Sequence, residues 1–179
     1  MRPAIRGAFV GLFCLPILLS AQAPSSTETV TILHPARVFD GDTVHEGWAV
    51  RVRGTHIDAV GPRASMSAPG AVVRELPGLT LLPGLVEGHS HILLHPYNET
   101  SWTDQVLKES LGLRVARATA ALKATLVAGF TTIRDLGTEG AGYADVELKQ
   151  AVEQGIIPGP RMLVSTRAIV ATGSYGPKG

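Results

Sequence analysis

Two histidines separated by one residue are the strongest candidates for chemistry in this sequence. His89 and His91 follow an apolar segment that ends at Val86. In a β-strand, residues i and i+2 point to the same face, so both imidazoles can ligate one cation. Each would give zinc a ring nitrogen at roughly 2.0–2.1 Å. A lone His-x-His pair also occurs by chance and on surfaces. The surrounding secondary structure therefore determines whether this pair indicates a metal site.

The loop that follows the pair holds three weaker candidates. His95 comes four residues after His91, and a loop histidine before a proline is favoured over a further metal ligand. Tyr97 and Asn98 are candidates for the mouth of a pocket, because sites in parallel α/β folds lie beside the loops that follow the strands. An ordinary turn explains them equally simply.

Further along the chain, Arg134 and Asp135 end a segment rich in Thr and Ile. They fit either a substrate contact or a structural ion pair. Residues 173–176 form a flexible loop by composition, and Tyr175 within it is a candidate substrate contact. His34, His45 and His56 are given no function.

The elements around the pair predict a parallel α/β arrangement. Residues 79–86 are an apolar run bounded by turn residues, which we interpret as a buried strand. Apolar residues spaced by three and four predict a helix over 103–128, with Ser101 or Thr103 as its cap and Gly129 after its end. Strands are expected over 130–134 and 162–165, with a shorter helix over 143–154. Alternating strands and helices indicate consecutive βαβ units, whose sites lie at the carboxyl ends of the strands.

Residues 28–78 have a different rhythm, with short strands and turns every eight to ten residues. Trp48, Val50 and Val52 alternate with less apolar residues, which predicts a half-buried strand. The segment is therefore expected to form a small sheet or sandwich that packs separately. An independent binding module is the alternative.

The first 23 residues are typical of an export signal. Arg2 and Arg6 precede an apolar run, and Ala21-Gln22-Ala23 supplies the small-x-small cleavage pattern. The run is shorter than the roughly 20 residues needed to cross a bilayer, so no stable membrane anchor is expected. Cys14, the only cysteine, would be removed, leaving a periplasmic or extracellular protein without disulfides. The formal net charge of +1 gives no reason to expect nucleic acid as a partner.

Three segments resemble motifs of the amidohydrolase superfamily. Residues 82–91, Leu-Pro-Gly-Leu-Val-Glu-Gly-His-Ser-His, are similar to its first-strand motif. Residues 129–137 resemble the second-strand motif of its imidazolonepropionase-like and prolidase-like branch, and residues 159–165 resemble that branch's third strand. The resemblance implies a small β-sandwich lead over 24–78, the N-terminal part of a composite domain. It also implies that residues 79–179 form the first three βα units of a (β/α)₈ TIM barrel, incomplete at this length.

In that family the two motif histidines bind a divalent metal, usually zinc, with one or two ions in the complete enzyme. The resemblance carries this role to His89 and His91 only. A bridging lysine, two further histidines and an aspartate are expected downstream of Gly179, where the given sequence ends. Glu87 stands where the family usually has aspartate and is a candidate for a position behind the ligands. No arginine follows the pair closely, which counts against an imidazolonepropionase.

Two functions remain open at this point. The first is a metal-dependent hydrolase of C–N bonds, of dipeptidase or prolidase type, acting on a dipeptide or another small molecule. This chain would then be an N-terminal fragment, inactive by itself, of an enzyme whose oligomeric state stays open. The second is a non-catalytic secreted binding module or an inactive fragment. Sequence downstream of Gly179 would discriminate between them.

Overall fold

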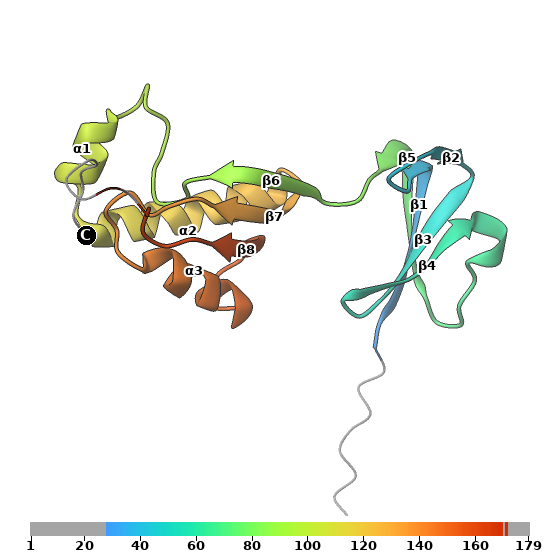
Figure 1. Ribbon diagram of the computed structural model, residues 1–179. Coiled ribbons are helices and arrows are strands. Elements are labelled where there is room, and N and C mark those ends of the chain that lie inside the picture. The colour runs from blue at the N-terminus through green and yellow to red at the C-terminus, as the bar shows by residue number, and fades with distance from the viewer. Residues whose placement is uncertain (1–27, 170, 172–179) are drawn as a thin grey trace, which may run out of the picture.

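The computed structural model describes residues 28–169 and 171. The expected export signal over 1–23 and the candidate Tyr175 lie outside these described residues. Two sheets, one of five strands and one of three, are joined by a short connection after Leu81 (Figure 1). The chain is thus a mixed α/β protein, as the sequence predicts.

The N-terminal sheet is built around its longest strands. In chain order its elements are β1 (Val30–Phe39), β2 (Val44–Glu46), β3 (Trp48–Arg53), β4 (His56–Pro62), a 3₁₀ turn (Arg63–Ser65) and β5 (Val72–Leu81). Strand β1 pairs antiparallel with β2 and β3 and parallel with β5. Pro35 does not end β1. It lies where the register with β5 shifts, which fits a residue without a backbone donor. The strands between Val30 and Leu81 form one sheet, and the sandwich stays a prediction.

The burial of β3 differs from the expectation. Ala49 is fully buried with Ile32 and Met66, on the face opposite Trp48 and Val52. Val50 is buried on the predicted face, but there it lines an open apolar groove of about 390 Å³. The alternation of β3 predicted one buried face, whereas Met66, after the 3₁₀ turn, covers the other.

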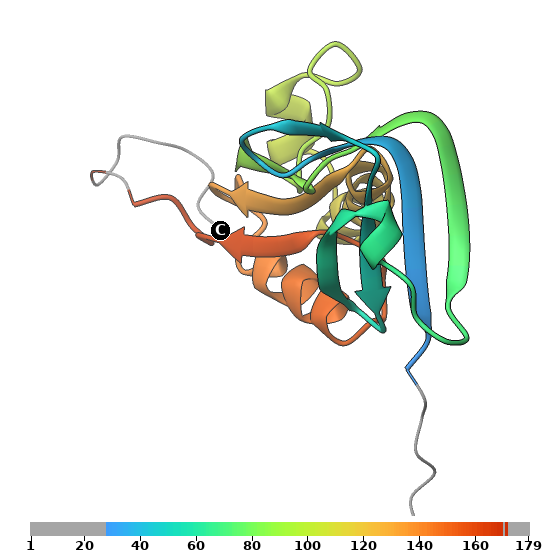
Figure 2. The same ribbon diagram turned by 90° about the vertical axis from the view of Figure 1, so that its right-hand side faces the viewer.

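The C-terminal part contains a parallel sheet with helices packed against it. Its elements are β6 (Leu85–Ser90), α1 (Trp102–Leu107), α2 (Leu111–Val127), β7 (Phe130–Asp135), α3 (Ala144–Glu153) and β8 (Arg161–Val164). The strand order is β6-β7-β8, and both pairings are parallel (Figure 2). Side chains of α2 and α3, with Leu122 and Leu148 at the centre, pack on Ile133 of β7 and Met162 of β8. The predicted order of parallel strands is therefore confirmed.

Two predicted elements are each divided. The apolar run over 79–86 belongs to two sheets, because β5 ends at Leu81 and β6 begins at Leu85. Gly84 in this connection crosses β7 so closely that a Cβ there would lie 2.0 Å from Thr131 Oγ1. The expected helix over 103–128 is broken between α1 and α2, where the Ser110 hydroxyl accepts the backbone N–H of Leu113 and caps a new helix. No helix within 28–169 is long and apolar enough to cross a membrane.

Candidate metal centre

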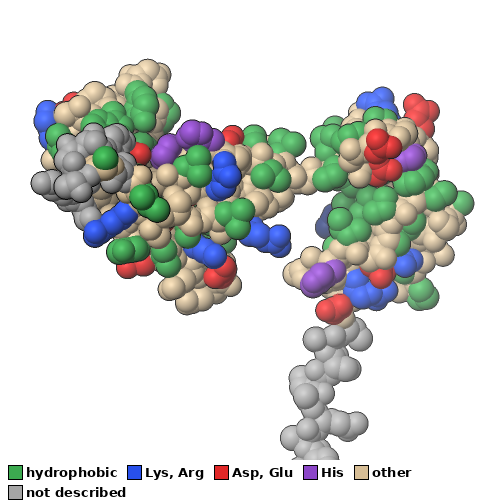
Figure 3. Space-filling model, in the orientation of Figure 1, with side chains coloured by type: hydrophobic (Ala, Val, Ile, Leu, Met, Phe, Trp, Pro, Cys, Tyr) green, Lys and Arg blue, Asp and Glu red, His purple; other side chains and the backbone are tan. Residues whose placement is uncertain are grey.

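The two histidines lie at the carboxyl end of β6, the first strand of the parallel sheet. Their ring centroids are 5.4 Å apart and the planes meet at 63°, so both rings occupy the same side of the chain. Histidine side chains gather on the surface near this end of β6 (Figure 3). The expected convergence of the pair is therefore observed.

The ring of His91 has a defined orientation. Its Nδ1 lies 3.0 Å from the backbone carbonyl oxygen of Gly137, in the turn after β7. A carbonyl oxygen only accepts hydrogen bonds, so Nδ1 carries the proton and donates it. In the neutral ring Nε2 then holds the free lone pair, which is the arrangement of a metal-ligating histidine.

Asp135 connects the backbone next to His91 with the backbone of Gly137. One carboxyl oxygen accepts the backbone N–H of Ile92, directly after His91, at 3.2 Å. The other accepts the backbone N–H of Gly137 at 3.1 Å. Together with the bond from His91 to Gly137, these contacts close a ring of hydrogen bonds. Asp135 thus holds the backbone next to the candidate ligand, instead of forming the ion pair with Arg134 that was considered from the sequence. A contact of Asp135 with substrate stays a prediction.

The electrostatic environment of Asp135 is unfavourable to its charge. Its side chain is completely buried at the end of β7. Burial raises the pKa of Asp135 to about 6, and the nearby Asp145 adds to this, while the two N–H donors and His91 oppose it. Desolvation outweighs the hydrogen bonds here.

The neighbours of the pair within β6 stabilise the strand. Glu87 accepts the backbone N–H of His89 at 2.8 Å and lines a separate hollow against the end of α2, away from His91. Ser90 donates its hydroxyl to the Arg134 carbonyl, and Arg134 donates to the Gly88 carbonyl. Arg134 and Asp135 therefore do not form an ion pair with each other. The side chain of Arg134 is exposed, whereas that of Asp135 is buried.

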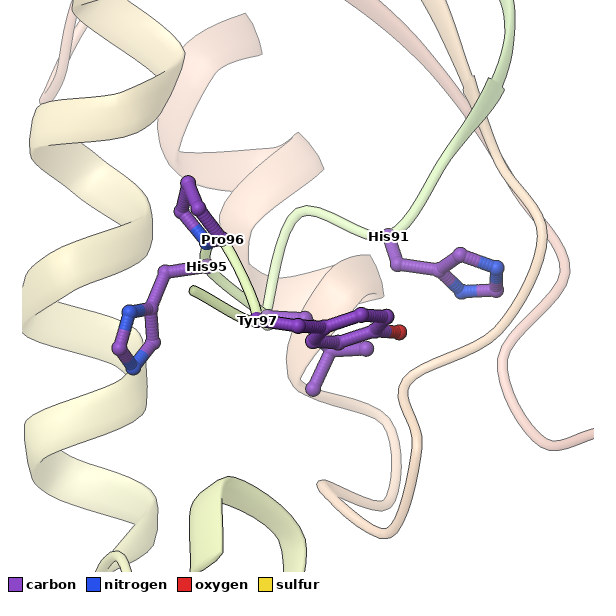
Figure 4. Close-up of a pocket in the computed structure, with 5 residues that line it drawn as sticks. His91, His95, Pro96 and Tyr97 are labelled. Carbon is purple, nitrogen blue, oxygen red and sulfur yellow. The ribbon is translucent and has the colours of Figure 1, made fainter. Parts of the chain in front are cut away.

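A hollow of about 300 Å³ adjoins His91 and is lined by Leu94, His95, Pro96 and Tyr97 (Figure 4). Tyr97 is 60% exposed and reaches across the hollow towards His91. His95 points in the opposite direction from His91. Asn98 is exposed in the same loop. The structure thus places Tyr97 beside the site, in line with the expected role at a pocket mouth.

The loop that carries Tyr97 is fixed by hydrogen bonds from α1. The buried amide of Gln105 in α1 accepts the His95 N–H and donates to the carbonyls of His95 and Thr100. The His95 ring lies between the carboxylates of Glu99 and Glu109, at 3.2 and 3.4 Å. His95 is therefore held within this loop by the two carboxylates.

Two residues that connect the loops around the pair were not predicted from the sequence. Glu139 places its carboxylate 3.7 Å from His91 Nδ1. Arg114 of α2 is buried and donates to the carbonyls of Leu93, Thr138 and Glu139, which connects the loops after β6 and β7. A signal for Arg114 was available, because it lies four residues before Ala118 on the buried stripe of α2.

The donor set fits part of a divalent metal site. Two imidazoles with Nε2 of one ring available are ligands that zinc accepts, and a catalytic zinc usually takes three protein ligands. In the described part of the chain, no group of three or more His, Cys, Asp or Glu side chains is arranged to hold an ion. A catalytic zinc bound to His89 and His91 would therefore need at least one further ligand from outside the described residues.

Comparison with known proteins places these features in a family context. Residues 80–174, just over half of the chain, match the amidohydrolase family. A dihydroorotase of Streptomyces coelicolor is 35% identical over 136 residues, which cover 70% of this chain and 29% of that protein.

Solved structures give the same result for the fold. The crystal structure of an amidohydrolase matches with a TM-score of 0.68 and 31% identity, covering 83% of this chain and 36% of the other. A prolidase complexed with N-methylphosphonate-L-proline matches with a TM-score of 0.66 and 32% identity, covering 84% and 36%. This chain spans about a third of the length of these relatives.

Proposed function

This chain belongs to the amidohydrolase family, and from that membership we propose that it contributes the first metal-binding strand of a hydrolase that cleaves C–N bonds. The observation that carries the proposal is the pair His89 and His91 on one side of β6, with His91 oriented through its Nδ1. The position agrees with the general location of sites in parallel α/β barrels, at the carboxyl ends of the strands. The barrel itself is part of the proposal.

The residues of this chain would hold a divalent ion, for which we propose zinc, through two imidazole nitrogens. When bound, such an ion polarises the scissile carbonyl and lowers the pKa of a water molecule towards ~7. His91 is prepared for this role because its other nitrogen already donates to the Gly137 carbonyl. The lysine, histidines and aspartate implied by the resemblance would come from strands beyond β8.

A dipeptide is the substrate class that we propose. Support comes from the similarity to a prolidase with a bound phosphonate analogue of a proline dipeptide, at 32% identity. The hollow beside His91 adds a second argument, because Tyr97, Pro96 and Leu94 offer an apolar wall to a substrate side chain. Dihydroorotase-like cleavage of a cyclic amide is the second candidate, favoured by the 35% identity to a dihydroorotase.

The experiment uses the full-length protein, purified with its metal content measured. We expect hydrolysis of Xaa-Pro dipeptides, and we expect His89→Ala and His91→Ala each to lose turnover together with bound metal. His56→Ala, which alters an exposed histidine in the N-terminal sheet, is the matched control and should change neither.

Full metal occupancy in the double variant His89→Ala/His91→Ala would refute the ligand assignment. Hydrolysis of dihydroorotate without any cleavage of dipeptides would leave the metal site intact and replace the substrate class. Export is proposed as well, and N-terminal sequencing of exported protein should then begin at Pro24.

A further inference from the structure

We propose that Glu139 is a positioning residue that, together with the Gly137 carbonyl, keeps the proton of the His91 ring on Nδ1 and thereby presents Nε2 to a divalent cation. The proposal rests on the role of His91 as a metal ligand proposed above. Metal-ligating histidines commonly donate their second ring N–H to a carbonyl or carboxylate, which fixes the tautomer and the orientation of the ring.

Two oxygen atoms surround Nδ1 of His91. The Gly137 carbonyl oxygen lies at 3.0 Å, and Oε1 of Glu139 lies at 3.7 Å. If the proton moved to Nε2, the lone pair of Nδ1 would face both oxygens without a hydrogen between them. The negative charge of Glu139 makes that alternative tautomer still less favourable, because its side chain is only 10% exposed and screening by water is weak.

The carboxylate of Glu139 is itself held in place. Its Oε2 accepts the indole N–H of Trp102 in α1 at 3.2 Å. Its backbone has a φ of 50°, a left-handed conformation that is uncommon for residues other than glycine. Arg114 donates to the carbonyl oxygens of Thr138 and Glu139 in this turn. Such strained conformations persist where the surrounding structure determines them, and they cluster at functional sites.

The chain offers a matched control. Glu99 is a second carboxylate next to a histidine, with Oε2 at 3.2 Å from Nδ1 of His95. His95 points away from the candidate metal centre and is held by Glu99 and Glu109. Removing the charge of Glu99, which is 62% exposed, therefore perturbs a carboxylate–histidine contact whose ring points away from His91.

The test compares full-length wild type with Glu139→Gln, Trp102→Phe and Glu99→Gln after removal of metal. Zinc affinity is measured by competition with a chelating dye, and the His91 tautomer is measured from the ¹⁵N shifts of its ring in the metal-free protein. We expect about 10- to 100-fold weaker zinc binding in Glu139→Gln, a smaller loss in Trp102→Phe, and a change within about twofold in Glu99→Gln. The share of the Nε2–H tautomer of His91 should rise in Glu139→Gln.

A folded Glu139→Gln protein with unchanged zinc affinity and an unchanged His91 tautomer would overturn the inference. Loss of one full equivalent of metal would also overturn it, because Glu139 would then be a ligand. If Glu139→Gln does not fold, Trp102→Phe decides, since it keeps the carboxylate and removes only its indole donor. If wild type binds no divalent metal, the proposed metal site fails, and the ring tautomers still test the positioning by Glu139.

Discussion

Substitution of Asp135 by asparagine tests which force dominates at this buried carboxyl group. The pKa of Asp135 is raised from 3.8 to about 6, mainly by burial. The folded protein therefore favours the protonated form relative to the unfolded chain. The resulting contribution to stability is complete below pH 3.8 and is lost as the pH rises through 6.

The size of the effect follows from the pKa difference. About 2 pKa units correspond to about 3 kcal/mol, of which about 2 kcal/mol is lost between about pH 4.5 and pH 7.5. Asparagine does not titrate. However, its amide nitrogen would face the backbone N–H of Ile92 or Gly137, and an unsatisfied buried group costs about 1–3 kcal/mol at every pH.

The assay is urea unfolding of the metal-free full-length protein, wild type and Asp135→Asn, across this pH range. Titrating groups distant from Asp135 affect both proteins alike, so the difference between the two unfolding free energies reports Asp135 together with its coupling to Asp145 and His91. We expect the wild type to lose about 2 kcal/mol relative to the variant as the pH rises across this range. A wild type that gains stability relative to Asp135→Asn would show that the two N–H donors outweigh desolvation, and the reasoning would be wrong.

Three further predictions concern packing and specificity. Leu122→Ala should lower the free energy of unfolding by about 2–5 kcal/mol, because this side chain is fully buried. The control Leu107→Ala, at an exposed position, should change it by no more than about 0.5 kcal/mol. Equal effects of the two substitutions would contradict the described core. Gly84→Ala should lower the melting temperature, since its Cβ would clash with Thr131, and Thr131→Gly in the same chain should restore part of the loss; an unaffected single variant would refute the close crossing. If the proposed dipeptide hydrolysis and metal site hold, Tyr97→Ala should lower kcat/KM more for dipeptides with a large apolar first residue than for Gly-Pro, with metal content unchanged. A uniform loss would show that Tyr97 does not determine substrate choice.

The sequence predicted the C-terminal part of the fold well because its signals are local. Helix α3 lies within one residue of its predicted range at each end, and β7 within one residue of its own. The Gly129 position after α2 has the expected positive φ of 99°. The histidine pair could be assigned to the carboxyl end of the first parallel strand from the same information. Strand alternation alone does not fix the two rings, because the register of β6 shifts between Glu87 and Ser90 and His91 follows the strand.

Failures occurred where competing local signals or tertiary contacts decide. The apolar run over 79–86 gave no sign that its two halves join different sheets, although Pro83 lacks the N–H that a continuous ladder would need. The break before α2 depends on Ser110, whose capping ability was masked by an apolar stripe continuing through Leu107 and Leu111. Both leucines are exposed in the structure, so the stripe there was apolar without being buried.

The position of Glu139 depends on contacts between distant segments. Its carboxylate is fixed by Trp102, 37 residues away, and its backbone by Arg114, 25 residues away. Part of this arrangement was nevertheless encoded in α2. Arg114 lies in register with the buried Ala118 and Leu122, and a buried guanidinium must find acceptors. Helix carbonyls are already paired, so the acceptors had to come from loops. An arginine on the buried face of the helix after the histidine strand therefore indicates that the loops converge beside that strand, which is where Glu139 meets His91.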